Sequence, residues 1–494
     1  MAYDLLAAVD LGSNSFRLQV GRLVGSQVYP LDGLKEPVRL AAGLKPDKRL
    51  DGESQERGFA ALARFSERLR GFDPGAVRAV ATNTLRVAKN AGQFLEKAES
   101  VLGFPIEVIA GREEARLIYL GVAHTLAQPE RRQLVVDIGG GSTECIIGQN
   151  VDPIRLESLY MGCVSFSLRF FPDGRVDKRN FKEAELAARR ELQGIVHEFR
   201  ESGWDEAIGS SGTAKALADL LEMNAWSDHG LTRDGLERLR AALLTAGSAS
   251  RLRLEGLRPD RIPVLPGGLA IMSAIFKEFG LERMAFSEGA LRLGVLYDLI
   301  GLHHHDDLRE TTVNRFMQRY EVDRRQAARV AHTAVELLQQ LVPAASDTDH
   351  PDVQYLVWAA RLHEIGISVA HSSYHKHSAY IIAFADMPGF SRRDQARLSR
   401  LVLAHRGKLE RAQPLRGEAP EWTLIFCLRV AVLLHRSRDD RLPPPRSASF
   451  TRTGFELRLG AGDLDQLPLT AAALADEAEQ WAGIGGELKV RRDG

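Results

Sequence analysis

The feature that most constrains this chain is a short motif that occurs twice, near residue 10 and again near residue 137. In the first copy, the apolar run LLAAVD ends at Asp10 and is followed by Gly12 and Ser13. In the second copy, LVVD ends at Asp137 and is followed by a run of glycines and a serine. A short apolar run that stops at a glycine-rich turn is typical of a buried strand entering that turn. Two such copies predict a duplicated α/β fold with a cleft between the halves.

Further strands and helices are predicted around both copies. Residues 16–24 alternate apolar and polar side chains as a strand does, and residues 77–81 and 106–110 form short apolar runs. Apolar residues at helical spacing predict helices over residues 54–69 and 113–127. The return strand of the second copy is expected to begin at Glu144.

The chain changes character near residue 306. Helical periodicity then dominates, over residues 315–341, 353–370, 392–405 and 422–436. A proline run at residues 442–446 breaks the pattern, and a strand pair, a helix and a last strand are expected over residues 448–459, 470–481 and 486–490. We therefore expect four domains: two α/β domains at residues 1–128 and 129–304, an all-α domain at residues 305–442, and a small α+β domain at residues 443–494.

Length and composition limit the possible functions. A chain of 494 residues is too long for one hydrophobic core. Its 65 Lys and Arg balance its 65 Asp and Glu, so a polyanion site must be a local patch, and we expect no nucleic-acid partner. Three cysteines without CxxC spacing fit a reducing cytosol. We expect neither a signal peptide nor a membrane-spanning helix, hence a cytoplasmic protein, and leave peripheral membrane association open.

The two copies of the motif suit charged ligands. In the first copy, backbone N–H groups after Asp10 can point at an anion, although a simple hairpin turn explains the same residues. In the second copy, consecutive glycines are costly in backbone entropy unless something must approach closely. Asp137 and Glu144 flank these glycines with carboxylates, which suit a hard cation such as Mg²⁺. A flexible hairpin is the plainer interpretation of the second loop.

Three further segments are candidates for phosphate binding or catalysis. Residues 209–213, GSSGT, open a predicted helix, where free N–H groups favour phosphate, although plain N-capping gives the same pattern. Arg86 follows a predicted strand end and would suit phosphate oxygens, or be a surface arginine. Glu113 and Glu114 lie about 100° apart around a helix, so only one can face a cleft, and both would also suit the helix dipole.

The predicted helical region also carries histidines and a basic stretch. Histidines such as His332, His363, His371 and His375 are interpreted as structural or solvated rather than as metal ligands. Residues 376–411 hold eight Lys or Arg against three Asp or Glu. This stretch is either a solvated face or a track for a long polyanion.

These segments, in this order, resemble the exopolyphosphatase and guanosine pentaphosphate phosphatase family, within the actin-like, ribonuclease H-like superfamily. The resemblance rests on the stretches AAVDLGSNSFRL, ATNTLR, GREEARLIYLGV, VVDIGGGSTE, YMGCVSF, GSSGTAKAL and SEGALRLGVLYD. It also extends over the second half of the chain, most clearly at RLHEIGISVAHSSYHKHSAYII. It implies a two-domain actin-like core, a helical domain like the HD metal phosphohydrolases, and a homodimer. The HD-like domain would be degenerate, because Glu364 and Val432 stand where aspartates are expected.

The resemblance also implies residue roles. Glu114 would be the general base, with Asp137 and Glu144 as further catalytic residues. Mg²⁺ would be the cofactor, held by Asp137, Glu144 and Asp10. The terminal phosphates would be bound by Gly12, Ser13, Asn14, Ser15, Arg86, Gly139, Gly140, Gly141, Ser142, Thr143, Ser211, Gly212 and Thr213.

The function expected from the sequence is exopolyphosphatase activity, the release of orthophosphate from the ends of inorganic polyphosphate. The nearest alternative is a guanosine pentaphosphate 5′-phosphohydrolase that uses the same site. An ATP-dependent kinase or ATPase is less favoured, because no sugar site is evident. The remaining alternative is a non-catalytic sensor of a polyanion or nucleotide alarmone.

Overall fold

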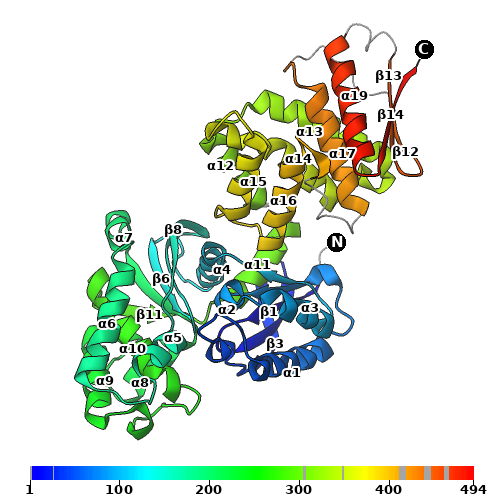
Figure 1. Cartoon of the computed structure of the whole chain (residues 1–494). Coiled ribbons are helices and arrows are strands. Elements are labelled where there is room, and N and C mark those ends of the chain that lie inside the picture. The colour runs from blue at the N-terminus through cyan, green and yellow to red at the C-terminus, as the bar shows by residue number, and fades with distance from the viewer. Residues whose placement is uncertain are drawn as a thin grey trace. The chain divides into compact units, whose positions relative to one another are not determined.

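Two compact units make up the chain, Met1–Asp307 and Leu308–Gly494, and each is considered by itself (Figure 1). The computed structural model describes residues 3–25, 27–303, 308–347, 350–410, 419–438, 447–460 and 467–493. The predicted breaker at residues 442–446 lies outside these ranges, as do His304 and His305.

The first unit begins with a five-stranded mixed sheet. Its strands in spatial order are β3 (Gln27–Glu36), β2 (Phe16–Val24), β1 (Leu5–Leu11), β4 (Val77–Ala81) and β5 (Ile106–Val108). The apolar side chains of the central strand β1 are almost all buried, as expected for a strand covered on both faces. One face packs on α1 (Gly52–Arg68) and α3 (Ala91–Leu102), and the other on α4 (Gly111–Ala123) and α11 (Leu291–His303).

A six-stranded sheet forms the other half of the first unit. Its strands in spatial order are β10 (Leu231–Thr232), β11 (Arg283–Phe286), β9 (Glu206–Ser210), β6 (Gln133–Ile138), β7 (Thr143–Gln149) and β8 (Asp152–Leu159). The helices of this half are α5 (Cys163–Phe170), α6 (Lys178–Leu192), α7 (Val196–Ser202), α8 (Ser211–Met223), α9 (Arg233–Ala246) and α10 (Leu265–Phe279).

The duplication predicted from the repeated motif appears in the strand order. In the first sheet, β3, β2 and β1 pair in antiparallel fashion, and β4 then pairs parallel to β1. In the second sheet, β8, β7 and β6 are likewise antiparallel, and β9 pairs parallel to β6. Asp10 and Asp137 therefore stand at equivalent strand ends.

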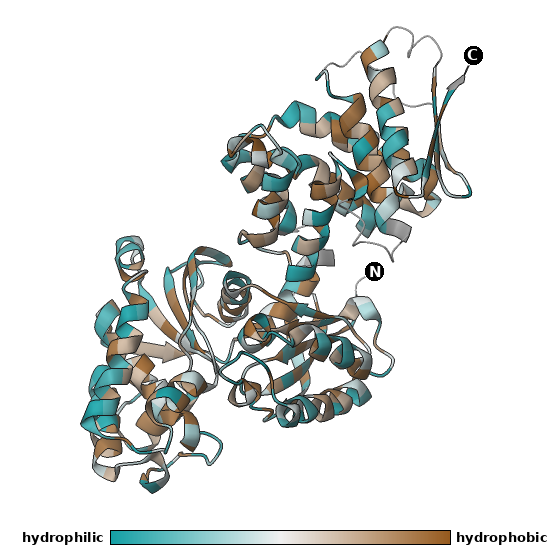
Figure 2. Ribbon diagram, viewed as in Figure 1, coloured by the Kyte–Doolittle hydropathy of each residue, from teal (hydrophilic) through white to brown (hydrophobic). Residues whose placement is uncertain are grey.

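Within the described residues, one window is long and apolar enough to cross a membrane, Ile262–Phe279, with a mean hydropathy of 1.3. However, 78% of this window is buried inside the protein, as in a core helix. Its α10 segment belongs to the hydrophobic core of the second half. Figure 2 shows the contrast between such apolar core elements and the hydrophilic outer helix α6.

The second unit is mainly helical and ends in a small sheet. Its helices are α12 (Leu308–Arg319), α13 (Arg324–Leu341), α14 (Pro351–Leu362), α15 (Tyr374–Phe384), α16 (Arg392–Ala404), α17 (Ala419–Leu434) and α19 (Pro468–Gly483). Its strands are β12 (Ser447–Phe450), β13 (Gly454–Gly460) and β14 (Glu487–Asp493). One hydrophobic cluster includes both the helices and the sheet, with Phe426 stacked on Phe455 at 4.1 Å between ring centroids. The division into four domains remains a proposal.

Two predicted helices are shorter than the sequence pattern suggested. The helix expected over residues 315–341 is two helices, because Glu321 adopts a left-handed φ of 50° and Asp323 caps α13 by accepting from Gln326 N. The helix expected over residues 353–370 ends at Leu362, and a 3₁₀ turn follows over Ile365–Ser368. The apolar periodicity of the sequence does not stop at either break, because the turns also contain apolar residues.

Candidate active site

A cleft of about 360 Å³ opens between the two sheets of the first unit, where the β1–β2 and β6–β7 turns meet. The turns are in close contact: a Cβ on Gly140 would lie 3.0 Å from the Ser13 Cβ and 3.2 Å from the Asn14 N. On Gly141 it would lie 2.2 Å from the Asn83 Nδ2. The glycine run therefore lets two backbone loops approach each other, in addition to any ligand.

Five acidic residues line this cleft: Asp10 of β1, Asp137 of β6, Glu144 of β7, Glu114 of α4 and Glu288, which follows β11. Burial raises the pKa of both Asp10 and Asp137 to about 6, and nearby carboxylates add to the rise. Burial, with Glu114 and Asp137 nearby, also holds the pKa of Glu144 well above its ordinary value. The Asp10 Oδ1 is buried without a hydrogen-bond partner among the described residues. The cleft thus concentrates negative charge that a cation would neutralise.

The carboxylates of the cleft fit a hard cation that takes most of its ligands from water and from phosphate oxygens. Within the described ranges, no three His, Cys, Asp or Glu side chains are gathered closely enough to hold a metal by themselves. Mg²⁺ commonly uses only one or two carboxylates and completes its shell with water and phosphate oxygens. The orphaned Asp10 oxygen and the raised pKa of Asp137 are consistent with such a site.

The two adjacent glutamates of α4 point to different partners, as their angular separation predicted. Glu114 lines the cleft, and its Oε2 accepts from the Arg86 Nη1 at 2.7 Å. Arg86 also donates to the Ile109 carbonyl oxygen at 3.0 Å. Glu113 is buried and pairs with Arg116. Arg86 was predicted to clamp phosphate, but it lies outside the residues that line the cleft and instead holds the Glu114 carboxylate.

Most of the predicted phosphate loops line the cleft: Gly12, Ser13, Asn14, Ser15, Gly139, Gly140, Ser142, Ser211, Gly212 and Thr213. Gly141 and Thr143 do not line it. The Thr143 hydroxyl is fully buried and donates to the Met161 carbonyl oxygen at 2.6 Å, so its role here is to hold the turn. Ser211, with a left-handed φ of 67°, begins α8, so the unpaired N–H groups of this helix start beside the cleft.

Basic side chains that the sequence did not single out also line the cleft: Arg17, Lys35, Lys215, Arg258, Arg261 and Arg292. Among the described residues, the side chains of Arg17 and Arg292 make no hydrogen bond or ion pair. Burial lowers the pKa of Arg17, and the neighbouring Arg292 lowers it further. Both guanidiniums lie near the charges of Asp10 and Asp137 but form a hydrogen bond with neither, so their N–H groups can bind an anion. The alternation of residues 16–24 predicted a strand but not its register, and the structure pairs Arg17 with Asp10 across β1 and β2.

Comparison with known proteins identifies the family. The model of the Ppx/GppA phosphatase family matches residues 20–303, and the model of Ppx/GppA phosphatase domain III matches residues 308–478. The chain belongs to the Ppx/GppA phosphatase family. As a Ppx/GppA phosphatase it is a hydrolase of phosphoanhydride bonds, and members are generally dependent on a divalent metal. This sets aside the kinase and the non-catalytic sensor.

Relatives of this Ppx/GppA phosphatase cover the chain to different extents. The guanosine-5′-triphosphate,3′-diphosphate pyrophosphatase of Aeromonas hydrophila is 38% identical over 97% of both chains. The crystal structure of the Aquifex aeolicus family member is 28% identical, with a TM-score of 0.52, and covers 61% of this chain and 99% of its own. An exopolyphosphatase from Cytophaga hutchinsonii, 24% identical with a TM-score of 0.55 over 60% of this chain and 98% of its own, shows the fold alone. Together they support the actin-like fold for the two sheet-bearing halves.

Three histidines of the second unit, His363, His375 and His405, are buried, whereas His332 and His371 are exposed. His363 and His405 are buried, with ring centroids 5.1 Å apart. Burial lowers the pKa of both. Glu364, which stands where an HD-type domain would carry an aspartate, accepts from Arg438 at 2.7 Å. The likeness of this unit to HD phosphohydrolases remains a proposal.

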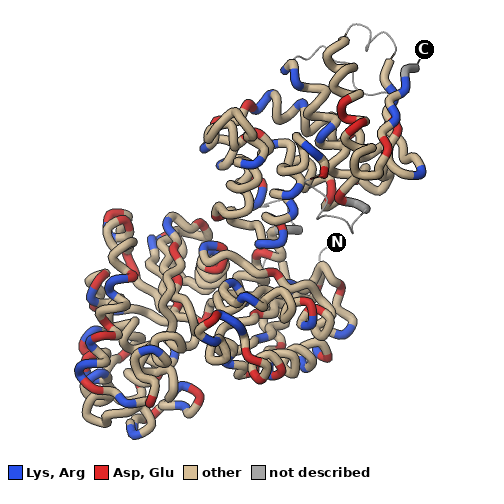
Figure 3. The backbone as a smooth tube through the Cα atoms, viewed as in Figure 1, with Lys and Arg blue, Asp and Glu red and all other residues tan. Residues whose placement is uncertain are grey.

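The basic stretch at residues 376–411 is partly used inside the second unit. Arg397 pairs with Asp352 at 2.6 Å and with Glu421 at 2.7 Å, and Arg392 donates to the Ala383 carbonyl oxygen at 3.2 Å. Arg411 lies outside the described residues. Figure 3 shows blue and red segments interspersed along both units rather than one basic block. The observed ion pairs favour a structural role for Arg397 over a polyanion track.

Proposed function

We propose that this Ppx/GppA phosphatase removes the terminal 5′-phosphate of guanosine pentaphosphate, and that inorganic polyphosphate is a secondary substrate. From the sequence alone, polyphosphate is the expected main substrate and guanosine pentaphosphate the alternative. The observation that carries the proposal is 38% identity, over 97% of the chain, to a guanosine-5′-triphosphate,3′-diphosphate pyrophosphatase. The expected homodimer and the cytoplasmic location belong to the same proposal.

The cleft also supports a nucleotide over a plain phosphate chain. Phe286, at the end of β11, is the aromatic side chain among the described residues that line the cleft. The Lys215 Nζ lies 5.1 Å from its ring centroid. A nucleobase can stack on such a ring beside a cation, whereas an inorganic chain gains nothing from it. The basic side chains of the cleft would serve either substrate, so polyphosphate is retained as the second candidate.

In the proposed mechanism, Glu114 acts as the general base. It accepts a proton from a water molecule as the water oxygen bonds to the terminal phosphorus and the anhydride P–O bond breaks. Orthophosphate leaves, and the nucleotide keeps the bridging oxygen and one phosphate fewer. The 2.7 Å hydrogen bond from Arg86 holds the Glu114 carboxylate in one orientation. The proton then passes from Glu114 to solvent.

The remaining residues bind and orient the substrate. The N–H groups of the two turns and of the α8 start would hold the terminal phosphate, with Arg17 and Arg292 neutralising its charge. One or two of the carboxylates of Asp10, Asp137 and Glu144 would hold Mg²⁺, together with water and phosphate oxygens. When bound, Mg²⁺ would neutralise phosphate oxygens and offset the repulsion among these carboxylates.

The test is to identify the products. The purified full-length protein is incubated with Mg²⁺ and guanosine pentaphosphate, and the products are separated by anion-exchange chromatography. We expect orthophosphate and guanosine tetraphosphate in equal amounts, and none when Mg²⁺ is replaced by a chelator. Release of pyrophosphate would place the cut at another bond, and no release at all from the nucleotide would reject the proposal.

A further inference from the structure

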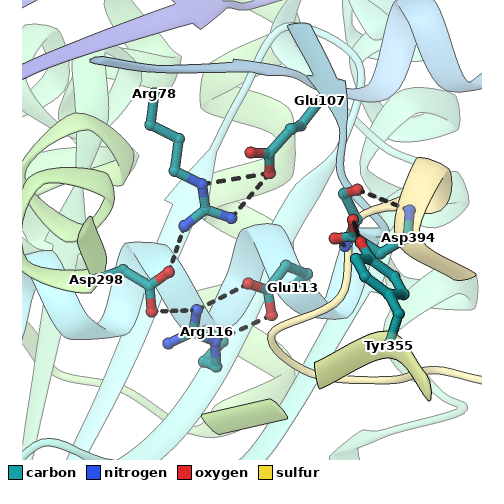
Figure 4. A network of polar contacts seen from close by, with 8 residues as sticks. Arg78, Glu107, Glu113, Arg116, Asp298, Tyr355 and Asp394 are labelled. Carbon is teal, nitrogen blue, oxygen red and sulfur yellow. Dashed lines mark hydrogen bonds and ion pairs between the residues drawn. The ribbon is translucent and has the colours of Figure 1, made fainter. Parts of the chain in front are cut away.

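A buried ion-pair network joins α4 and α11, two helices that contribute residues to the cleft, and Asp298 of α11 is at its centre (Figure 4). One oxygen of Asp298 accepts from the Arg116 Nη2 at 2.6 Å, and the other accepts from the Arg78 Nη1. The side chains of Asp298, Arg78 and Arg116 are 11%, 6% and 8% exposed. Burial alone would raise the pKa of Asp298, but the two guanidiniums hold it below its ordinary value. Asp298 therefore remains an anion shared by two cations.

Each arginine has a second carboxylate partner. Arg116 binds Glu113 through two hydrogen bonds, of 2.9 Å and 2.7 Å. Arg78 binds Glu107 of β5 at 3.0 Å. The network thus joins four elements, β5, β4, α11 and α4, in one continuous set of contacts (Figure 4). The Tyr355–Asp394 hydrogen bond drawn in the same view belongs to the second unit.

The backbones of α4 and α11 also touch. A Cβ on Gly294 would lie 1.7 Å from the Leu117 carbonyl oxygen, and one on Gly121 would lie 2.3 Å from the Ala290 carbonyl oxygen. Glycines at this contact let the helices approach with no side chain between them. This packing fixes the separation of the two helices, and the buried side chains of Leu117, Ile118 and Tyr119 hold the body of α4 in the core. The ion pairs of Glu113, Glu114 and Arg116 add a separate restraint on the orientation of its first turn.

The first turn of α4 is therefore held from two sides. On one side Glu114 is bound by Arg86, and on the other side Glu113 is bound through Arg116 to Asp298. The N-terminal end of α11, including Arg292, itself lines the cleft. Asp298 thus ties the helix that carries Glu114 to the helix that forms part of the cleft wall.

We propose that Asp298 is a positioning residue for catalysis, which fixes the orientation of Glu114 toward the attacking water through Arg116 and Glu113. A shift in the first turn of α4 would displace the Glu114 carboxylate, and a displacement of about 1 Å costs on the order of 10²-fold in rate. The proposal rests on the role of Glu114 as base, but not on which phosphoanhydride substrate is preferred.

The test is Asp298→Asn, assayed with whichever substrate the wild-type enzyme turns over. We expect kcat to fall about tenfold or more with KM changed little, because the lost restraint acts on the reacting geometry rather than on binding. The acid limb of the kcat–pH profile should also move, because Glu114 would sit in an altered environment. A purely structural ion pair would lower the melting temperature and leave kcat and the profile of the folded enzyme unchanged.

Glu107→Gln is the matched control. It removes the other partner of Arg78, is also isosteric, and leaves the α11–α4 connection in place, so kcat should remain within about twofold. Wild-type kcat and pH profile in folded Asp298→Asn, or an equal loss in both variants, would overturn the proposal. If Asp298→Asn does not fold, Arg116→Lys takes its place, since it keeps the charge but loses the paired hydrogen bonds, and an unchanged kcat there would also overturn it. Glu114→Gln measured in parallel reports separately on the base.

Discussion

Asp10 and Asp137 occupy equivalent positions in the two sheets, each as the penultimate residue of a central strand that ends at the cleft. Their cross-strand neighbours differ: Asp10 stands opposite Arg17, and Asp137 stands opposite Glu144. The same duplicated scaffold therefore offers a cation on one side and a second carboxylate on the other. This asymmetry suits a phosphate that must meet both an arginine and a metal.

Glu114→Gln tests the general base. The substitution keeps the shape of the side chain and its contact with Arg86 but removes the proton acceptor. We expect kcat to fall by about 10²–10⁴-fold with little change in KM. Glu96→Gln, an exposed change on α3, is the control and should leave kcat unaltered. Near wild-type phosphate release by Glu114→Gln would mean that another group activates the water.

Arg17→Ala tests the anion site. Arg17 makes no ion pair among the described residues, so its loss should weaken phosphate binding rather than the fold. A charge-assisted hydrogen bond contributes about 1.5–3 kcal/mol, so KM should rise roughly 10- to 150-fold for any substrate of the cleft. Arg22→Ala, an exposed arginine on the same strand, should leave KM unchanged. Equal KM values for the two variants would remove Arg17 from the site.

Phe286→Ala tests whether the cleft recognises a nucleobase. Stacking of a base on an aromatic ring contributes about 1–3 kcal/mol, so kcat/KM for guanosine pentaphosphate should fall about 5- to 150-fold. The value for polyphosphate should stay near wild type, and Phe286→Tyr should retain activity toward both. An equal loss for the two substrates would show that the ring merely supports the cleft.

The buried histidines predict a pH dependence in the second unit. The pKa of His363 and of His405 lies below the ordinary value of about 6.5, so below that pH the unfolded state binds more protons than the folded state. Their contribution to stability is present above pH 6.5 and is lost as pH falls toward their folded pKa values. Hydrogen exchange of α14 and α16, measured by mass spectrometry, should quicken between pH 7 and pH 5 beyond the intrinsic pH effect. A flat corrected rate would contradict this.

Local patterns predicted much of the first unit. The strand over residues 77–81 was placed at its observed bounds, because a short apolar run between turn residues has few other solutions. The divergence of Glu113 and Glu114 followed from helix geometry alone. The repeated motif located the two facing turns.

The features of the site that the sequence could not predict depend on tertiary contacts. Arg86 could not be assigned to Glu114 from the sequence, because their pairing is a contact between α2 (Asn83–Val87) and α4. The basic lining of the cleft was missed, because Arg17, Arg258 and Arg292 come from distant segments of a chain with balanced charge. Phe286, which we propose to recognise a nucleobase, was also missed, because no motif includes it.

The most direct measurement is kcat/KM for orthophosphate release from guanosine pentaphosphate and from long-chain polyphosphate, with Mg²⁺ and the same preparation of the enzyme. We predict the higher value for guanosine pentaphosphate. A higher value for polyphosphate would contradict the proposed substrate and restore the exopolyphosphatase assignment.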